Sequence, residues 1–263
     1  MATRAPDRVD PARLPPGGPG HVIRYRRPAR LFHAAIYLVT FVLLGTGWWL
    51  RTGHEGEPSL LARTIDVADV EIHRQAGWLL VAVVTVGVTL GFRGAFTFVR
   101  ETLRFNRGDG TWFRRWPFGA FTGKFVPHKG HFDPGQRIVN VAFVATIGTL
   151  VVTGVGLTTV HGGSQFVALS RVHRGSTYFL TVLIVAHVII AIGVLPGYRG
   201  AWRSMHGRGK TPVETARRLW PASLDSQKSG ESPRCEPHRA HSTIDDARHS
   251  RAASGSLEGD THR

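Results

Sequence analysis

Residues 173–187 read HRGSTYFLTVLIVAH, an apolar run with a histidine at each end. The apolar character continues to Leu195, so this segment is long enough to cross a hydrocarbon core of about 30 Å at about 1.5 Å per residue. On a helix the two histidines return to within about 40° of one face and lie about 21 Å apart along the axis. An ionisable side chain in such a span is costly, which makes both histidines candidate functional residues.

Three further segments have the same length and composition. They cover residues 31–50, 73–92 and 138–160, and together with 173–195 they give four predicted membrane spans. Trp48 closes the first of them, as is typical of an aromatic side chain at a bilayer interface. The sequence therefore predicts an all-α membrane protein built as a four-helix transmembrane bundle.

The charged residues between the spans predict the orientation of the chain. Residues 93–137 contain nine Lys or Arg against three acidic residues, whereas residues 51–72 contain two against five. Positively charged segments stay on the cytoplasmic side, so we expect residues 93–137 and both basic termini to be cytoplasmic. The net charge of +15 flanks apolar spans, which favours membrane lipid as a partner and argues against nucleic acid.

The two ends of the chain contain few large apolar residues. Residues 1–23 and 221–263 are therefore predicted to be disordered cytoplasmic tails around a membrane domain at 24–220. No apolar run precedes the first span, so we expect no cleavable signal peptide. Cys235, the single cysteine, lies in the second tail, which excludes a disulfide framework and a motif for covalent haem attachment.

Four of the 14 histidines lie within or at the edges of the spans. With the predicted orientation, His73 and His173 share the outer level of the bilayer, and His33 and His187 share the inner level. Neutral imidazole is a good axial ligand, and a six-coordinate haem iron needs two. The sequence therefore predicts two non-covalent b haems, one bound through its iron by each pair.

Two other interpretations of these histidines remain open. Any one of them, taken alone, is also explained as an interfacial residue that caps a span. The protein is alternatively a non-redox transporter or scaffold whose histidines bind a metal ion or move protons. Transporters of that kind usually have paired breaks in the middle of their spans, whereas these four spans contain no proline.

The chain resembles the gamma subunit, a cytochrome b, of membrane-bound formate dehydrogenases. That family belongs to a wider di-haem group with hydrogenase-associated and bacterial b561-type cytochromes. The resemblance extends over about residues 24–207. It rests on RLFH at 30–33, His73 at the start of the second span, FDPGQR at 132–137, HRGSTYFLTVLIVAH at 173–187 and GYRGAWRSMHG at 197–207.

The resemblance implies an electron-transfer subunit in a bacterial plasma membrane that does not itself act on formate. Electrons would enter at the outer haem from an iron–sulfur subunit, which is joined to a molybdenum or tungsten catalytic subunit, and would reduce quinone near the inner haem. The alternative is a free-standing cytochrome b561-like quinol oxidoreductase without a dehydrogenase partner.

The motif before the third span bears on the quinone. In the family it usually reads Tyr-Asn-Ala-Gly-Gln-Lys, with the asparagine close to the quinone, whereas Asp133 and Pro134 replace Asn-Ala here. Asp133 and Gln136 are therefore the quinone-site candidates, with the carboxyl group as a hydrogen-bond acceptor or proton source. Alternatively, this motif only turns the chain into the third span.

Overall fold

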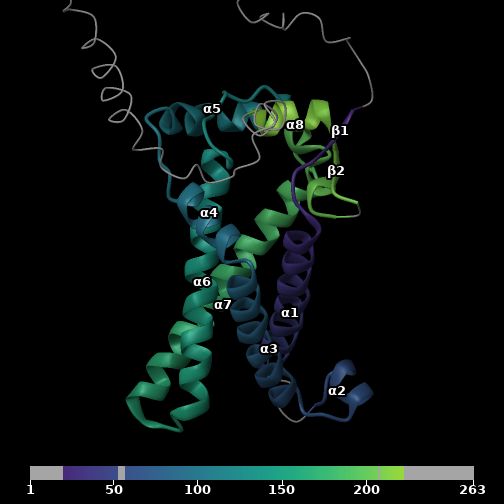
Figure 1. Ribbon diagram of the computed structural model, residues 1–263. Helices are drawn as coiled ribbons and strands as arrows, with labels where there is room; N and C mark the ends of the chain where they lie inside the picture. Colours follow the sequence, from purple (N-terminus) through teal and green to yellow (C-terminus); the bar gives the residue numbers. More distant parts are fainter. Residues whose placement is uncertain (1–19, 53–56, 207, 222–263) are drawn as a thin grey trace, which may run out of the picture. The chain divides into compact units, whose positions relative to one another are not determined.

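A computed structural model describes residues 20–52, 57–206 and 208–221 of the chain, so the predictions for residues 1–19 and 222–263 lie outside the described residues. Four helices are long and apolar enough to cross a membrane, and Figure 1 shows them running along one another. The predicted all-α membrane bundle is confirmed. The four helices are α1 (Arg27–Arg51), α3 (Asp69–Leu90), α6 (Pro134–Thr159) and α7 (Gly163–Ala191).

The fourth helix begins and ends earlier than the predicted span at 173–195. Residues 163–172 continue the helix, so α6 and α7 are joined by a short turn instead of a loop of twelve residues at 161–172. At the other end, Gly193 adopts a φ of 81°, a left-handed conformation that glycine tolerates and that ends the helix before Pro196.

The spanning helices form two pairs, with α1 along α3 and α6 along α7. Val39, Ala76 and Leu80 form a small buried core against Ile147 and Val151 of α6. Many outward-facing apolar side chains are exposed, as expected of surfaces that contact lipid.

The basic segment between the second and third spans contains two helices that were not predicted from the sequence. These are α4 (Phe92–Thr102) and α5 (Asp109–Thr122), and α5 lies across one end of the spanning helices in Figure 1. At the opposite end, the short α2 (Leu60–Ile65) precedes α3.

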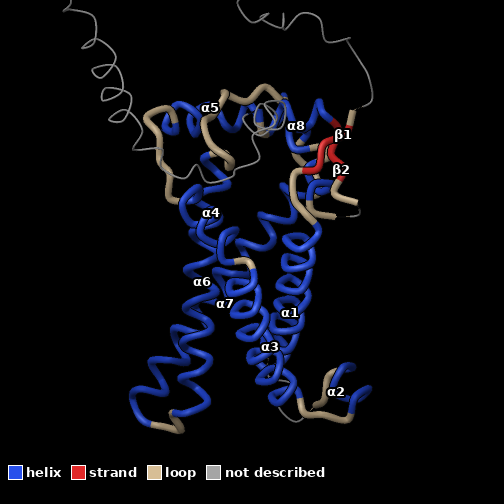
Figure 2. The backbone as a smooth tube through the Cα atoms, viewed as in Figure 1, coloured by secondary structure: helices blue, strands red, loops and turns tan. Residues whose placement is uncertain are grey.

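Strand β1 (His21–Ile23) shows that the last residues of the segment predicted to be disordered, 1–23, are ordered. It pairs antiparallel with β2 (Lys210–Pro212), and Figure 2 shows the two strands side by side. In this pairing Val22 lies opposite Thr211. The partner strand is almost 190 residues away in the chain, so local composition gives no sign of this order. After β2, the helix α8 (Val213–Leu219) packs into a second core, which contains Ala120, Tyr198, Leu219 and Trp220.

Arg137 joins the basic segment to the first turn of α6. Its side chain is only 1% exposed. The guanidinium donates hydrogen bonds to the carbonyl oxygens of Phe132 at 3.0 Å and Arg104 at 2.6 Å, and to that of Lys129. It also forms an ion pair with Asp109 at 3.0 Å. A buried charge with this many acceptors holds the surrounding segment in one arrangement.

Candidate functional site

The rings of His73 and His173 lie together at the end of the bundle that carries α2. Their centroids are 6.3 Å apart, and the ring planes are inclined at 77°. His73 belongs to α3 and His173 to α7, so this contact joins the two helix pairs. Both side chains are half-buried.

A second pair lies toward the end of the bundle that carries β1 and β2. The ring centroids of His33 on α1 and His187 on α7 are 6.4 Å apart, with an interplanar angle of 53°. Phe143 of α6 packs edge-on against His187 at 5.5 Å. The sequence predicts a buried His187, but in the chain alone this residue is exposed.

Both separations fit a pair of axial ligands. Metal–imidazole bonds are about 2 Å long and the ring centre lies roughly 1 Å beyond the nitrogen, so two imidazoles on opposite sides of one ion have centroids roughly 6 Å apart. The structure thus brings together the residues of each predicted pair at a spacing suited to one iron. The ligand role itself stays a prediction.

A buried threonine orients each ring of the first pair. Oγ1 of Thr46, on α1, lies 2.9 Å from Nδ1 of His73 and also donates a hydrogen bond to the Val42 carbonyl at 2.8 Å. Because the hydroxyl proton is used there, the threonine oxygen accepts the ring N–H. Nδ1 therefore carries the proton, and the lone pair of Nε2 is available for a metal.

The same arrangement recurs in the other helix pair. Oγ1 of Thr153, on α6, lies 2.9 Å from Nδ1 of His173 and donates to the Thr149 carbonyl at 2.7 Å. In each helix pair, the first helix supplies a hydroxyl group and the second supplies an imidazole. A hydrogen bond from the non-ligating nitrogen is the usual way in which proteins fix the orientation of a histidine ligand.

A glycine follows each of these threonines and leaves room beside the ring. A Cβ atom on Gly47 would lie 3.2 Å from Cε1 of His73, and one on Gly154 would lie 3.5 Å from Cε1 of His173. A side chain at position 47 would press on the imidazole. The Thr-Gly pairs therefore combine a hydrogen-bond acceptor with close approach of the backbone.

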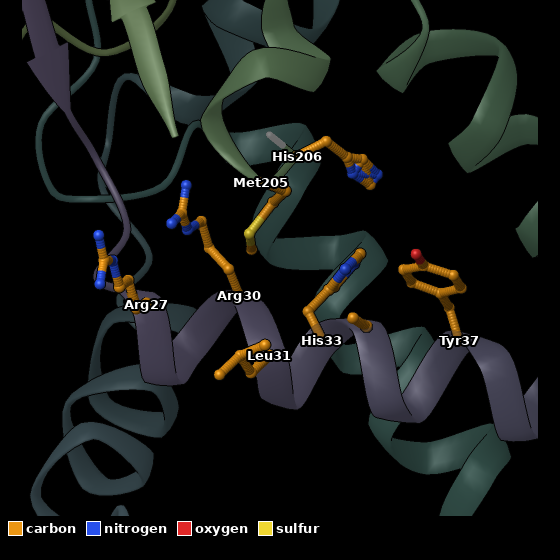
Figure 3. A pocket seen from close by; sticks show the side chains of 8 residues that line it. Arg27, Arg30, Leu31, His33, Tyr37, Met205 and His206 are labelled. Atoms are coloured by element: carbon orange, nitrogen blue, oxygen red, sulfur yellow. The ribbon is translucent and has the colours of Figure 1, made fainter. Parts of the chain in front are cut away.

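His33 has two further aromatic neighbours, Tyr37 and His206. The ring centroid of His206 is 6.2 Å from that of His33 and 5.9 Å from that of Tyr37. Figure 3 shows His33 and Tyr37 extending from α1 toward Met205 and His206. These side chains line a cavity of about 320 Å³ together with Arg27, Arg30, Leu31 and Ala34.

The chain matches the family model of prokaryotic cytochrome b561 over residues 24–208. The chain belongs to the prokaryotic cytochrome b561 family. It is therefore a bacterial membrane b-type cytochrome, and haem b is its cofactor in electron transfer. A search of curated proteins found no match. The match covers nearly the whole predicted membrane domain and supports the wider group to which the sequence motifs pointed, without selecting the formate dehydrogenase gamma subunit within it.

Asp133 of this cytochrome has a structural role at the start of α6. Its Oδ1 accepts a hydrogen bond from the backbone N–H of Gln136 at 2.8 Å, which is the arrangement of a helix N-cap. Asp133 is buried, and burial raises the pKa of its carboxyl group despite the opposing hydrogen bond from Gln136. Gln136 is half-buried. The predicted contact of these residues with quinone is not tested by this geometry.

Four residues around the histidine pairs of the cytochrome were not predicted from the sequence: Thr46, Thr153, Tyr37 and His206. Threonine is common in membrane helices and gives no signal by itself. One sign was available, since a Thr-Gly pair occurs at 46–47 and again at 153–154. His206 follows the last span in a polar segment, where a histidine is easily attributed to contact with water.

Proposed function

We propose that the cytochrome is a di-haem electron carrier, with one haem on His73 and His173 and the other on His33 and His187. The main support is the presence of two imidazole pairs toward opposite ends of the bundle, each at the spacing of two ligands on one iron. On α7 the two ligands are about 21 Å apart along the axis. Haems at these positions would form a path from one leaflet to the other.

His206 is a second neighbour of His33 at a similar ring separation. We assign the inner pair to His187 because it lies in a spanning helix opposite His33, whereas His206 lies after the 3-10 turn at Ala201–Ser204 and outside the spanning helices. An axial ligand held on a rigid helix changes position least when the iron changes its charge.

Bound haem supplies a one-electron change of oxidation state, and the chain supplies the environment for it. The four histidines would provide axial nitrogens. Thr46 and Thr153 fix two of these rings, and Gly47 and Gly154 keep side chains away from them. The surrounding apolar helices exclude water, which restricts rearrangement of solvent around the transferred charge.

The partners that we propose follow from the resemblance. Electrons would pass from an iron–sulfur dehydrogenase subunit at the face near His73 and His173, and quinone would be reduced near His33 and His187, with protons from the cytoplasm. The basic residues in 93–137 support the cytoplasmic location of the second face. Asp133 and Gln136 lie at the start of α6 on that side, and we propose that quinone approaches them from the bilayer.

The redox function is tested with the full chain, purified in detergent after expression with adequate haem. A reduced-minus-oxidised absorption spectrum should show b-type bands, and a soluble quinol analogue should reduce the protein. Absence of b-type bands would exclude the proposal. If b-type bands are present but do not respond to any quinol or quinone analogue, the quinone step would be excluded and the electron-carrier role would stand.

The dehydrogenase partner needs a separate test. The tagged cytochrome, extracted from its native membrane in mild detergent, should retain an iron–sulfur subunit and a molybdenum- or tungsten-containing subunit. Recovery of the haem-loaded cytochrome alone, under conditions that preserve other respiratory complexes, would favour the free-standing quinol oxidoreductase.

A further inference from the structure

A basic cavity lies where β1, the first turn of α1 and β2 meet. Its volume is about 470 Å³, and five of its seven lining residues are cationic. Its two other lining residues are Ile23 and Tyr25, and no acidic residue lines it. We call it the basic cavity; it is lined by Ile23, Tyr25, Arg26, Arg27, Arg30, Arg208 and Lys210.

Within the described residues, little negative charge balances this cavity. No ion pair within the described part of the chain involves Arg26, Arg208 or Lys210. The first turn of α1 contains no acidic residue, although the positive end of a helix dipole favours one there. These three like charges beside one cavity repel one another, so an anionic ligand would relieve the repulsion.

The backbone holds the cations of the cavity in place. Ile23 lies opposite Lys210 in the antiparallel pair, which places the two sides of the cavity next to each other. Between Arg208 and Lys210, Gly209 has a φ of 69°, and a Cβ atom there would clash with the guanidinium of Arg30. Arg30 is half-buried against Gly209, whereas the other four cations are exposed and can reach an anion that enters the cavity.

The position of the cavity indicates the kind of anion. It lies at the first turn of a membrane-spanning helix, where the bilayer surface is expected. Directly after Arg30, the side chain of Leu31 is 70% exposed, and farther along α1 Leu38 is 59% and Phe41 51% exposed. An anion in the cavity could therefore have acyl chains that lie along this apolar surface.

We propose that the basic cavity binds the headgroup of an anionic phospholipid, and specifically a diphosphate lipid of the cardiolipin class. Basic pockets beside spanning helices are suited to such headgroups. The four exposed cations of the cavity, Arg26, Arg27, Arg208 and Lys210, exceed what one phosphate needs, whereas two phosphates joined by a short linker can each contact two of them. This site does not depend on the proposed redox function.

The test uses the haem-loaded full chain and a variant that changes only residues of the basic cavity. Arg26→Gln, Arg208→Gln and Lys210→Gln are combined, because these three residues do not line the neighbouring cavity beside His33. The matched control combines Arg114→Gln, Arg115→Gln and Lys124→Gln, which removes the same charge from positions elsewhere on the chain. Binding of cardiolipin, phosphatidylglycerol and phosphatidylcholine is measured by native mass spectrometry in detergent.

We expect the wild type and the control to bind cardiolipin with equal affinity, and the cavity variant to bind it at least tenfold more weakly. Phosphatidylcholine should not compete. Equal binding by the cavity variant and the control would overturn the proposal. Displacement of the lipid by millimolar inorganic phosphate would overturn it in favour of a free-phosphate site.

Haem content, measured on the same samples, tests whether haem propionates occupy the basic cavity instead of a lipid headgroup. Loss of haem by the cavity variant with unchanged lipid binding would show that these cations serve haem propionates, and would overturn the lipid assignment. If the triple variant does not fold, Arg26→Gln alone is compared with Arg114→Gln. Its cardiolipin affinity should fall several-fold, and an unchanged affinity would contradict the proposal.

Discussion

Oγ1 of Thr46 lies 2.9 Å from Nδ1 of His73, although the two residues are 27 positions apart in the chain. The same separation joins Thr153 to His173 in the other helix pair. Each hydroxyl already donates to a carbonyl of its own helix, so its oxygen is left to accept the ring N–H. The rings of His73 and His173 are therefore fixed in the same way, with both Nε2 atoms available for the iron of the proposed outer haem.

Replacement of Thr153 by valine should raise the midpoint potential of the outer haem. The isosteric side chain removes the hydroxyl acceptor of the ring N–H, which lowers the basicity of the ligand and favours the reduced iron. The net value of one hydrogen bond is about 1 kcal/mol, and about 59 mV corresponds to a tenfold change for one electron, so a shift of some tens of mV is expected. Redox titration followed by absorbance measures it.

Thr149→Val is the control for this substitution. Thr149 is on the same helix and makes the same kind of bond to the carbonyl four residues earlier, at 2.9 Å, but it contacts no histidine within the described residues. Its variant should keep both potentials. Equal shifts in the two variants would show that the effect comes from the helix and not from the His173 ring.

Gly47→Ala should reduce occupancy of the outer haem. The added methyl group would lie 3.2 Å from Cε1 of His73, which is closer than most carbon contacts and would push the ring out of position. Gly45, two residues earlier on α1, has nothing within 4 Å of the corresponding position. Gly45→Ala should therefore retain the haem content of the wild type, and a similar loss in both variants would argue against contact with the ring.

The sequence was most informative where structure depends on local composition. The four spans follow from runs of apolar residues, and the histidines follow from their cost within those runs. Helices α4 and α5 were missed because their segment is read locally as a charged loop, whereas Arg137 holds it through contacts with residues up to 33 positions away. Thr46, Thr153 and His206 were missed because their contacts exist only after the helices pack.

Arg137→Ala should destabilise the end of the bundle that carries α5. The substitution removes hydrogen bonds to three carbonyl groups and leaves the half-buried carboxylate of Asp109 without its cation. Loss of one partner from a buried pair costs about 3–5 kcal/mol. Thermal unfolding in detergent should show a lower midpoint, with exposed Arg115→Ala within about 0.5 kcal/mol of the wild type. A midpoint equal to that of Arg115→Ala would contradict this role.

The stability of the chain should fall as the pH decreases from about 6.5 to 4, in part because of His131. Burial, aided by the charge of Arg24, lowers the pKa of this histidine from 6.5 to about 4. The unfolded chain therefore binds a proton in this range before the folded chain does, and acid favours unfolding.

Between pH 7 and pH 5, the His131→Gln variant should lose up to about 2 kcal/mol less of its free energy of unfolding than the wild type loses. Over this range the unfolded histidine becomes protonated while the folded one stays neutral, and a tenfold change in proton concentration corresponds to about 1.4 kcal/mol, reduced where the ring is partly exposed. Unfolding midpoints of the wild type and the variant at the two pH values measure the difference. If both proteins lose the same stability, another group is responsible.

The assignment of four histidines to two haems is decided by the amount of haem b bound per chain in single His→Ala variants. We predict two haems in the wild type and one in each of His33→Ala, His73→Ala, His173→Ala and His187→Ala, with the His73 and His173 variants lacking the same spectral component. His206→Ala and the exposed His161→Ala should keep both haems. The assignment would be contradicted if the wild type bound only one haem, or if His206→Ala lost a haem while His187→Ala kept both. It would also be contradicted if the two variants of one pair lost different spectral components.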